Sequence, residues 1–489
     1  MLLRDITTEL ELLEQICPEF LDTQITDITS DSRSVSTGSL FIAINGHTVD
    51  GHKFIESAIE KGAVAVLYSD DAYTKRITDG KAVPLKVESS WEASIQVSAN
   101  FFRHPDREIT VVGVTGTNGK TTIATLLYRL FSKLGYRCGL LSTIANYVGE
   151  EKFPTFNTTA DPITLRRLMR RMADTGCQYC FMEVSSHALE QGRVRGLDFT
   201  GAIFTNLTHD HLDYHKTFSE YIRCKKILFD TLPSSAFALI NADDRNGKIM
   251  VQNTKAKVME YGLNHLVDFK ASIIEKSLEG SLLRINTDEV WTRFIGRHNA
   301  YNIAAVYGTA LLLGANKDEV LKEISLLEPV SGRMEILRGG DSLTVVVDYA
   351  HTPDALENVM RTLKEVSPSS PLTALFGCGG DRDRTKRPEM AEAVARYADR
   401  IIITSDNPRS EDPVAIINDV EKGIPQDKKS ITLSITDRAE AIRTAIKTAP
   451  KGGIILLAGK GHEDYQIING VKTHFDDKEQ ACNALSELK

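Results

Sequence analysis

The sequence has no stretch of about 20 consecutive apolar residues, the length that a membrane-spanning helix needs. Its first residues, MLLRDITTELELLEQICPEF, carry acids among the apolar positions, which is not the pattern of a signal or transit peptide. The formal net charge is only −8 over 489 residues, so nothing in the charge favours a nucleic acid or an anionic membrane as partner. We therefore expect a cytoplasmic protein that binds no nucleic acid and does not insert into a membrane.

Cysteine is also scarce. The seven cysteines are scattered and odd in number, which does not suggest a disulfide framework. They are interpreted as reduced core thiols of a cytoplasmic protein, and the two in CQYC, Cys177 and Cys180, as neighbours in one strand. Internal repeats and low-complexity tracts are absent as well.

The chain is too long for one hydrophobic core and predicts two to four domains. The periodic pattern breaks at RHPDRE (103–108) and at LEPVSGRME (327–335), both of which combine proline with charge. These breaks predict three domains. Their expected bounds are 1–105, 106–329 and 330–489.

Strand-like and helix-like segments alternate along the chain. In the first block, residues 38–44 and 63–67 are predicted as short strands, with a helix over 54–61 between them. The third block alternates from LTVVVDYA to GIILLAG. Such alternation predicts parallel sheets wound with helices, and therefore an α/β fold whose ligands lie at the carboxyl ends of strands.

The middle block opens with a buried strand, EITVVGV, followed by a loop and by a helix that stops at Gly135. ADPITLRRLMRRMADTG is predicted as a helix, because Asp161 suits the N-cap, Pro162 the first turn and Gly176 the C-terminal stop. CQYCFMEV, TGAIFTN and AFALIN then supply strands separated by helices.

The stretch VVGVTGTNGKTT resembles a phosphate-binding loop between a strand and a helix. Its relevant residues are Gly116, Asn118, Gly119, Lys120 and Thr121. Glycines let backbone N–H groups surround a phosphate, the lysine neutralises phosphate charge, and the hydroxyl can bind Mg²⁺. The alternative is a glycine turn that caps a helix. Val114 stands where the strict G-x4-GK[ST] pattern has its first glycine, which argues against ordinary kinases and GTPases.

Six motifs in order make the chain resemble the Mur ligase family, the ATP-dependent amide-forming enzymes of peptidoglycan synthesis. They are GTNGKTT, EVSSHAL, TNLTHDHLDYH, GRHNAYNIAAV, SGRMEIL and VDYAHTPDALE. The first block, with TSDSRSV and GSLFIAINGHTVDGHKFI, resembles the uridine-nucleotide domain of the branch that adds the third peptide residue. The resemblance implies a small α/β uridine-nucleotide-binding domain, a central P-loop-type ATPase domain with a mostly parallel sheet, and a Rossmann-like C-terminal domain.

The implied reaction couples meso-2,6-diaminopimelate to UDP-N-acetylmuramoyl-L-alanyl-D-glutamate, with release of ADP and phosphate. A carboxylate resists nucleophiles, so ATP would first convert it to an acyl phosphate, which an amine then attacks. Bringing the γ-phosphate and the carboxylate together requires positive charge from Lys120 and from Mg²⁺. We expect small-molecule substrates and a monomer.

The resemblance also implies metal ligands and a modified lysine. Glu183, at the end of the strand CFMEV, offers a hard oxygen to Mg²⁺, and Thr121 adds a hydroxyl. His211 resembles the second metal-site ligand, although it could simply be a histidine hydrogen-bonded within a polar loop. In EYIRCKKILF, alignment from the tyrosine selects Lys225 as the lysine that CO₂ or bicarbonate converts to N6-carboxylysine, and leaves Lys226 as a solvated helix charge.

Two further groups of residues match family contacts. The ATP-binding set comprises Gly116, Thr117, Asn118, Gly119, Lys120, Thr121, Thr122, His298, Asn299, Asn302, Arg333, Asp348 and, beside it, His351. Asn299 and Asn302 could instead cap a helix. The set for the uridine substrate comprises Ser32, Arg33, Thr158, Thr159, Ser185, Gln191 and Arg193. Arg333 lies at the boundary between the second and third blocks, where a hinge would let the third block close over ATP.

The stretch IIITSDNPRSEDP carries the expected amino-acid selectivity. Diaminopimelate differs from lysine by a second carboxylate, and a guanidinium fork such as that of Arg409 is the natural reader of a carboxylate. In this family DNPR resembles the diaminopimelate-selecting form. The full expected set is Arg382, Asp406, Asn407, Pro408, Arg409, Gly459 and Glu463. The alternative is a surface turn in which Arg409 pairs with Glu411 or Asp412.

Two rival functions are weighed against this one. A folylpolyglutamate-synthase-type ligase would share the phosphate loop and the lysine, but the uridine-type first block and DNPR argue against it. The second rival is a non-catalytic P-loop protein that uses ATP as a switch. It is disfavoured because it would leave Glu183, His211 and Lys225 without a shared function.

Overall fold

The computed structural model describes residues 1–46, 49–155, 157–208, 210, 212–339 and 343–487. The chain forms two compact units. Unit 1 comprises Met1–Gly113 and Tyr136–Gly201, and unit 2 comprises Val114–Gly135 and Ala202–Lys489. The chain first crosses from unit 1 to unit 2 within the buried strand β5 (Thr110–Thr115).

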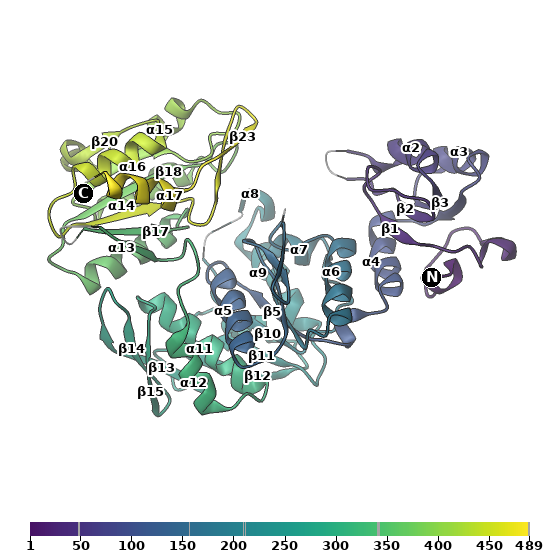
Figure 1. Ribbon diagram of the computed structural model, residues 1–489, viewed down its shortest axis with the longest axis horizontal. Coiled ribbons are helices and arrows are strands. Elements are labelled where there is room, and N and C mark those ends of the chain that lie inside the picture. The colour runs from purple at the N-terminus through teal and green to yellow at the C-terminus, as the bar shows by residue number, and fades with distance from the viewer. Residues whose placement is uncertain (47–48, 156, 209, 211, 340–342, 488–489) are drawn as a thin grey trace. The chain divides into compact units, whose positions relative to one another are not determined.

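The N-terminal part of unit 1 is a parallel sheet of four short strands in the order β1-β2-β3-β4. The strands are β1 (Asp27–Thr29), β2 (Ser39–Ile42), β3 (Ala63–Tyr68) and β4 (Val83–Lys86). Its helices are α1 (Leu3–Ile6), α2 (Ile55–Glu60), α3 (Thr74–Asp79) and α4 (Ser90–Phe101). The predicted strands over 38–44 and 63–67, and the helix between them, are confirmed (Figure 1).

The rest of unit 1 contains four further strands and two helices. They are β6 (Cys138–Leu141), β7 (Asn146–Val148), β8 (Glu151–Phe153), α6 (Pro162–Asp174), β9 (Tyr179–Glu183) and α7 (Ser186–Glu190). β9 pairs with β6 in parallel, whereas β7 and β8 add antiparallel pairs to β6.

The predicted α6 is confirmed down to its caps. Asp161 accepts hydrogen bonds from the backbone N–H groups of Ile163 and Thr164, both at 3.0 Å. Gly176 follows the helix with φ +77°, a conformation that glycine adopts without strain. The interpretation of CQYC as two neighbours in one strand is wrong: β9 begins at Tyr179, so only Cys180 belongs to it.

Unit 2 begins with the nucleotide-loop helix and continues through a parallel sheet. Its first elements are α5 (Lys120–Lys133), β10 (Gly201–Phe204), α8 (Leu212–His215), α9 (Phe218–Asp230), β11 (Phe237–Asn241), α10 (Gly247–Met250), β12 (Lys257–Gly262), β13 (Phe269–Lys276), β14 (Ser281–Ile285), β15 (Asp288–Thr292), α11 (Arg297–Leu312) and α12 (Lys317–Leu326). β11, β12 and β13 are parallel, and β13, β14 and β15 form an antiparallel extension. Nothing in the sequence reasoning anticipated that extension.

The C-terminal part of unit 2 is a six-stranded sheet in the order β16-β17-β21-β18-β19-β20. Its strands are β16 (Glu335–Arg338), β17 (Thr344–Asp348), β18 (Leu372–Cys378), β19 (Arg400–Ser405), β20 (Thr432–Ser434) and β21 (Ile454–Ala458). Its helices are α13 (Pro353–Val366), α14 (Lys386–Ala395), α15 (Pro413–Glu421), α16 (Arg438–Lys447) and α17 (Asp477–Ser486). All pairs are parallel except β16 with β17, and β22 (Tyr465–Ile468) with β23 (Val471–His474) forms a separate hairpin.

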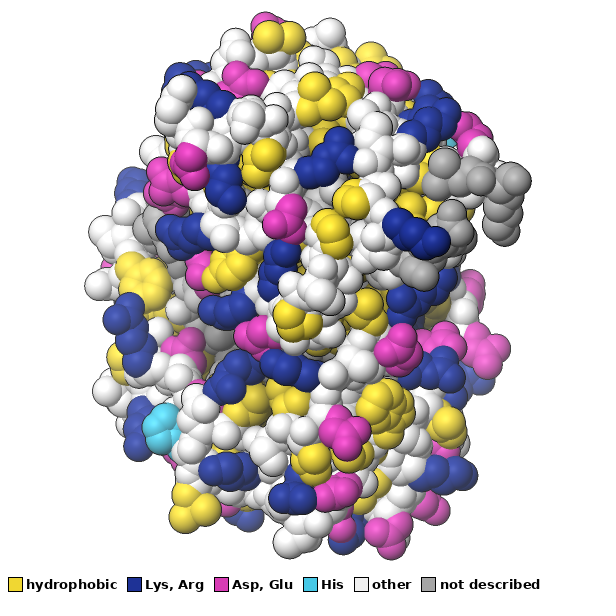
Figure 2. Space-filling model, turned by 90° about the vertical axis from the view of Figure 1, so that its left-hand side faces the viewer, with side chains coloured by type: hydrophobic (Ala, Val, Ile, Leu, Met, Phe, Trp, Pro, Cys, Tyr) yellow, Lys and Arg dark blue, Asp and Glu magenta, His cyan; other side chains and the backbone are white. Residues whose placement is uncertain are grey.

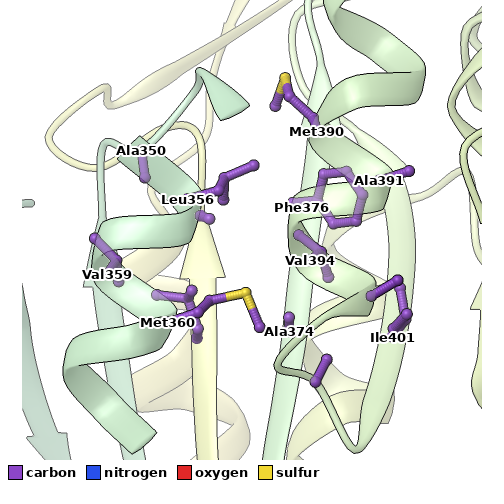
Figure 3. Close-up of a cluster of buried hydrophobic side chains, with 14 of the residues drawn as sticks. Ala350, Leu356, Val359, Met360, Ala374, Phe376, Met390, Ala391, Val394 and Ile401 are labelled. Carbon is purple, nitrogen blue, oxygen red and sulfur yellow. The ribbon is translucent and has the colours of Figure 1, made fainter. Parts of the chain in front are cut away.

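A cluster of buried apolar side chains covers one face of this sheet. Figure 3 shows Leu356 and Met360 of α13 and Met390 and Val394 of α14 packed over Phe376 of β18. All five side chains are at most 3% exposed. Burying one such side chain contributes about 1.5–3 kcal/mol, so this cluster holds the carboxyl ends of β17, β18 and β19 in fixed positions.

The surface carries mixed charge. On the face in Figure 2, basic and acidic side chains are interspersed, with apolar side chains scattered among them. Across the described ranges, no helix is both long enough and apolar enough to cross a bilayer. All seven cysteines are free thiols; five are buried as expected, whereas Cys17 and Cys482 are exposed.

Candidate active site

The nucleotide loop follows β5 and ends where α5 begins at Lys120. A side chain at Gly116 would place its Cβ 1.9 Å from the Thr205 hydroxyl oxygen, and one at Gly119 would meet the Asn302 side-chain oxygen at 2.8 Å. Both glycines also have positive φ angles, +147° and +92°. Only glycine fits at either position, which is the backbone requirement of a loop that wraps a phosphate.

Two lysine side-chain nitrogens converge on one carbonyl of this loop. Lys120 Nζ donates to the carbonyl oxygens of Gly116 and Thr117, both at 2.9 Å. Lys225 Nζ, from α9, donates to the same Gly116 oxygen at 2.8 Å. Lys225 is 1% exposed. Burial first, and the charge of Lys120 second, hold the pKa of Lys225 well below its ordinary value, which favours the neutral amine.

The two adjacent lysines of α9 have different surroundings. Lys225 packs with its ammonium 4.7 Å from the centre of the Tyr221 ring, whose hydroxyl lies 3.2 Å from the Thr117 hydroxyl. Lys226 is ion-paired with Asp230 one turn further along the helix. Its side chain is only 12% exposed, so it is less solvated than we expected. Lys225 is thus the lysine that faces the nucleotide loop.

A cavity of about 340 Å³ opens beside the loop. Nine of the residues predicted for the ATP site line it: Asn118, Gly119, Thr122, His298, Asn299, Asn302, Arg333, Asp348 and His351. They come from the loop, from the start of α11, from the segment before β16 and from the end of β17. Residues more than 200 positions apart therefore surround one space.

The start of α11 contributes Arg297 and several neutral polar side chains to the cavity wall. Asn299 donates to the Ile295 carbonyl at 3.0 Å, and Asn302 donates to the Asn299 side-chain oxygen at 3.1 Å. The capping alternative does not apply to Asn299, because α11 has no side-chain cap at its N-terminus among the described residues and Asn299 donates to a carbonyl instead of accepting from a helix N–H group. Burial, and secondarily the charge of Arg361, lower the pKa of His298 to about 4, so its ring is neutral at pH 7.

Arg333 and Asp348 meet at the beginning of the third block. Arg333 lies 4.5 Å above the Tyr349 ring and makes one long contact, 3.4 Å, with the Thr121 hydroxyl. Its Nε is buried and has no hydrogen-bond partner among the described residues. Asp348 accepts from the N–H groups of Met334 and Ala350 at 2.7 and 2.8 Å, and burial raises its pKa. Arg333 therefore has donors to spare for an anion in the cavity.

Sequence reasoning missed a second polar group in the cavity wall. Asp243 accepts hydrogen bonds from the backbone of Leu263 at 2.7 Å and Asn264 at 2.9 Å, and from the Tyr301 hydroxyl at 2.7 Å. It also contacts His265 Nδ1 at 2.5 Å. Asp243 follows the strand FALIN, so the rule that ligands lie at carboxyl ends of strands could have identified it.

The hydrogen bonds to Asp243 predict a pH dependence of stability. Although burial opposes the charge, the donors lower the pKa of Asp243 to about 2. A lowered carboxyl pKa stabilises the folded state above the unfolded pKa of about 4, and that contribution is lost as pH falls toward 2. We expect Asp243→Asn to lower the free energy of unfolding by about 2 kcal/mol at pH 7, measured by urea denaturation. The difference should narrow between about pH 4 and pH 2; a difference independent of pH would contradict the assignment.

Unit 1 holds the predicted Glu183 and the residues around it. Glu183 ends β9, is 1% exposed, and accepts from the Thr143 N–H at 2.8 Å. Thr159 donates its hydroxyl to the Glu183 carbonyl at 2.8 Å and accepts from the Ser185 N–H at 3.1 Å. Thr158 lies 3.2 Å from the Thr143 hydroxyl. The structure thus brings Glu183, both threonines and Ser185 together.

Gln191 and Arg193 join the same cluster. Arg193 donates to the Thr159 carbonyl at 2.7 Å and to the Gln191 side-chain oxygen at 2.9 and 2.7 Å. Trp91 of α4 donates its indole N–H to the Gln191 carbonyl at 2.7 Å. Ser32 lies in the segment between β1 and β2, where its carbonyl accepts from Lys61 at 2.8 Å. The adjacent Arg33 is exposed and ion-paired with Asp31 at 2.8 Å.

The turn after β19 holds Arg409 in a strained backbone conformation, φ +56°. Backbone hydrogen bonds with the β22 hairpin fix it: its N–H donates to Ile467 at 3.0 Å and its carbonyl accepts from Asn469 at 2.7 Å. The guanidinium donates to the Gly380 carbonyl at 2.7 Å. A Cβ at Gly379 would lie 2.8 Å from the Arg409 Nη1 and 3.8 Å from the Arg382 Cγ, so both arginines lie beside Gly379.

The alternative pairing of Arg409 is not what the structure contains. Glu411 is ion-paired with Arg387 at 2.9 Å and with Arg384 at 3.0 Å. Asp412 instead caps α15, accepting from the Val414 N–H at 3.1 Å. The carboxylates that follow Arg409 in sequence are thus engaged elsewhere.

The other predicted residues of this pocket contact one another. Asn407 donates to Glu463 at 2.9 Å, and buried Lys460 donates to the Asn407 side-chain oxygen at 3.2 Å. A Cβ at Gly459 would lie 2.7 Å from an Asp406 carboxylate oxygen. Burial, and then the charge of Asp406, raise the pKa of Glu463. The turn at 406–409 and the turn at 459–463 therefore contact each other and bring side chains of both charges together.

His211 lies outside the described residues. Within the described part of the chain, no group of three or more histidine, cysteine or acidic side chains could hold a metal ion. Thr121 in unit 2 and Glu183 in unit 1 each carry an oxygen of the hard kind that Mg²⁺ prefers. An unmodified Lys225 ammonium does not fit a cation site, because like charges repel.

The glycine loop, its lysine and the cavity at the carboxyl ends of strands define a nucleotide-binding α/β protein. Comparison with known families matches three descriptions: "Mur ligase family, catalytic domain" over residues 24–103, "Mur ligase middle domain" over 114–310, and "Mur ligase, glutamate ligase domain" over 332–461. The chain belongs to the Mur ligase family.

Individual relatives cover nearly the whole chain. UDP-N-acetylmuramoyl-L-alanyl-D-glutamate–2,6-diaminopimelate ligase of Parabacteroides distasonis is 51% identical over 98% of both chains. The Bacteroides fragilis enzyme of the same name is 51% identical over 94% of both chains. A solved structure with that name has 33% identity and a TM-score of 0.69, covering 100% of this chain and 99% of its own. The α/β fold expected from the sequence is confirmed.

Proposed function

We propose that the chain is an ATP-dependent ligase that adds meso-2,6-diaminopimelate to the D-glutamate γ-carboxylate of UDP-N-acetylmuramoyl-L-alanyl-D-glutamate. ADP, phosphate and the UDP-tripeptide are the products. The observation that carries the proposal is the cluster of mixed charge on the contacting turns of Arg409 and Glu463, which suits the zwitterionic end of a diamino diacid, in a member of an amide-ligase family.

The chemistry assigned to the nucleotide loop is activation of the carboxylate. A glutamate carboxylate oxygen attacks the γ-phosphorus of ATP and displaces ADP, giving an acyl phosphate. The amine of diaminopimelate then attacks the acyl carbon, and phosphate leaves. Lys120 supplies positive charge where two anions must approach each other, supported by its place at the start of α5.

Mg²⁺ is assigned to Thr121, Glu183, His211 and the carbamate of Lys225, and when bound it would neutralise phosphate charge. A neutral Lys225 amine adds CO₂ with loss of one proton, forming a carbamate anion. The lowered pKa of Lys225 supports this step, because only the free amine is a nucleophile. The modification replaces a buried cation by an anion.

The remaining assignments follow the geometry of each unit. In unit 2, the start of α11 would bind the nucleoside. Arg333, whose Nε has no hydrogen-bond partner among the described residues, would bind the γ-phosphate. Unit 1 would hold the uridine substrate through Ser32 and the cluster of Thr158, Thr159, Ser185, Gln191 and Arg193. We further propose the three-domain division at about 105 and 329, a cytoplasmic location and a monomer.

The proposed amino-acid site uses charge on both ends of the ligand. Arg409 and Arg382 would bind the distal carboxylate of diaminopimelate. Glu463 and Asp406 would bind its distal ammonium group. Asn407 orients Glu463 through its side-chain amide, and Pro408 restricts the backbone of the turn.

An endpoint assay with purified protein, ATP, Mg²⁺, bicarbonate and the uridine dipeptide precursor tests the proposal. A panel of amino acids supplies diaminopimelate isomers, lysine and glutamate. We expect UDP-tripeptide and stoichiometric phosphate only with diaminopimelate. Phosphate release without any amine or carboxylate would instead favour an ATP-driven switch, and glutamate addition a folylpolyglutamate-synthase-type ligase.

A further inference from the structure

A fully buried charge pair lies behind the amino-acid pocket. Arg438 is the first residue of α16 and Asp477 the first residue of α17, and both side chains are 0% exposed. The guanidinium binds the carboxylate through two bonds, Nε to Oδ1 at 2.7 Å and Nη2 to Oδ2 at 2.6 Å. The pair therefore joins the N-termini of two helices that pack against the same sheet.

The same guanidinium also binds the ends of two strands. Its Nη1 donates to the Ser405 carbonyl at 3.3 Å and its Nη2 to the Ala458 carbonyl at 3.0 Å. Ser405 is the last residue of β19 and Ala458 the last residue of β21. Because β18 lies between these strands in the sheet, no ladder hydrogen bonds join them directly. Arg438 bridges that gap at the carboxyl edge.

The next residue of each strand belongs to the proposed pocket. Asp406 follows Ser405, Gly459 follows Ala458, and the two turns touch where a Cβ at Gly459 would meet Asp406. Although burial opposes its charge, Asp477 holds the pKa of Arg438 above its ordinary value, and the carboxylates of Asp406 and Glu463 contribute. The guanidinium thus lies within electrostatic reach of the proposed ammonium-binding acids.

Arg438 is not placed to bind the substrate itself. Its donors are occupied by Asp477 and by two backbone carbonyls. Lys460, also 0% exposed, lies closer to the acids, with its Nζ 3.6 Å from Glu463 and 3.9 Å from Asp406. Arg438 therefore acts on this site without touching the substrate, through the backbone that it holds and through its charge.

We propose that the Arg438–Asp477 pair is a positioning element for diaminopimelate recognition. It fixes the spacing between the turn at 406–409, which carries the guanidinium fork, and the turn at 459–463, which carries the carboxylate. The inference rests on the proposed function of this pocket.

The test is the double variant Arg438→Met/Asp477→Leu in the full-length enzyme. Removing both charges together avoids leaving one buried charge unpaired, and such replacements are often tolerated. Because a displacement of about 1 Å can cost a reaction roughly 100-fold, we expect the KM for diaminopimelate to rise at least about 10-fold. The preference for diaminopimelate over lysine should fall by a similar factor, while the KM values for ATP and the uridine substrate stay within about 2-fold.

A matched control uses the opposite edge of the same sheet. Lys364 binds Asp399 at 2.6 Å, and Asp399 accepts from the N–H of Leu372 at the amino end of β18. Lys364→Met/Asp399→Leu should leave the KM for diaminopimelate and the amino-acid preference unchanged.

The possible results distinguish a failure of this inference from a failure of the proposed function. A variant with a lowered melting temperature but unchanged KM and preference for diaminopimelate would show that the pair is only structural and overturn the inference. Wild-type protein that makes no UDP-tripeptide would overturn the proposed function instead. If the double variant does not fold, Arg438→Lys, which keeps a positive charge beside Asp477 but removes the planar fork, is measured by the same criteria.

Discussion

Replacing Lys225 by alanine is expected to abolish nearly all ligase activity. The proposed carbamate would be lost, and with it several kcal/mol of metal-based charge stabilisation, a loss of roughly 1,000-fold in turnover. Short-chain carboxylates such as formate or acetate should restore part of the activity, because they can enter the space left by the side chain and supply an anion. Phosphate release and UDP-tripeptide formation measure both effects.

Lys226→Ala is the matched control on the same helix. Lys226 is paired with Asp230 and does not contact the nucleotide loop in any described interaction, so its loss should change turnover by no more than about 2-fold. Full activity of Lys225→Ala would show that the reaction does not need a carbamate at this position. Equal losses in the two variants would indicate a general effect on α9.

Arg409→Ala is expected to reduce kcat/KM for diaminopimelate far more than kcat/KM for lysine. Removing one partner of a buried charge pair costs about 2–5 kcal/mol, which corresponds to roughly 30-fold to several-thousand-fold in kcat/KM. Lysine lacks the distal carboxylate, so its already low kcat/KM should change little. The measurement is kcat/KM for both amino acids in wild type and variant.

Arg396→Ala is the control for Arg409. Arg396 belongs to the same C-terminal block but is exposed and pairs with Glu357 at 3.0 Å, so neither amino acid should be affected. An equal loss for both amino acids in Arg409→Ala would show that the arginine supports the turn without reading the carboxylate. The comparison between diaminopimelate and lysine is needed because Arg409 has a strained φ of +56°, so its replacement also changes the backbone of the turn.

Local signals in the sequence were sufficient to predict many of the helices and strands. Asp161, Pro162 and Gly176 predicted the bounds of α6, because capping and termination are decided by residues within one turn. The glycine loop was predicted for the same reason. The antiparallel strands β13, β14 and β15 were missed, because pairing between neighbouring strands leaves a weaker pattern than a capped helix.

Contacts between distant segments were beyond sequence reasoning. Arg438 and Asp477 are 39 positions apart, and neither stands in a motif, so only the fold shows that they form a buried pair. Asp243 was overlooked although it follows a predicted strand, because a single acid at a strand end is a weak signal. By contrast, the grouping of Arg409, Arg382 and Glu463 in one site was predicted only through the family resemblance. In the structure, Arg409 and Arg382 lie beside Gly379, and Glu463 is bonded to Asn407.

The central claim is that ATP converts the glutamate γ-carboxylate into an acyl phosphate before the amine attacks. The most direct measurement uses uridine substrate labelled with ¹⁸O in that carboxylate, with ATP, Mg²⁺ and diaminopimelate. Mass spectrometry of the released phosphate should show one ¹⁸O atom transferred for each UDP-tripeptide formed. Phosphate that carries no label while tripeptide accumulates would contradict the account.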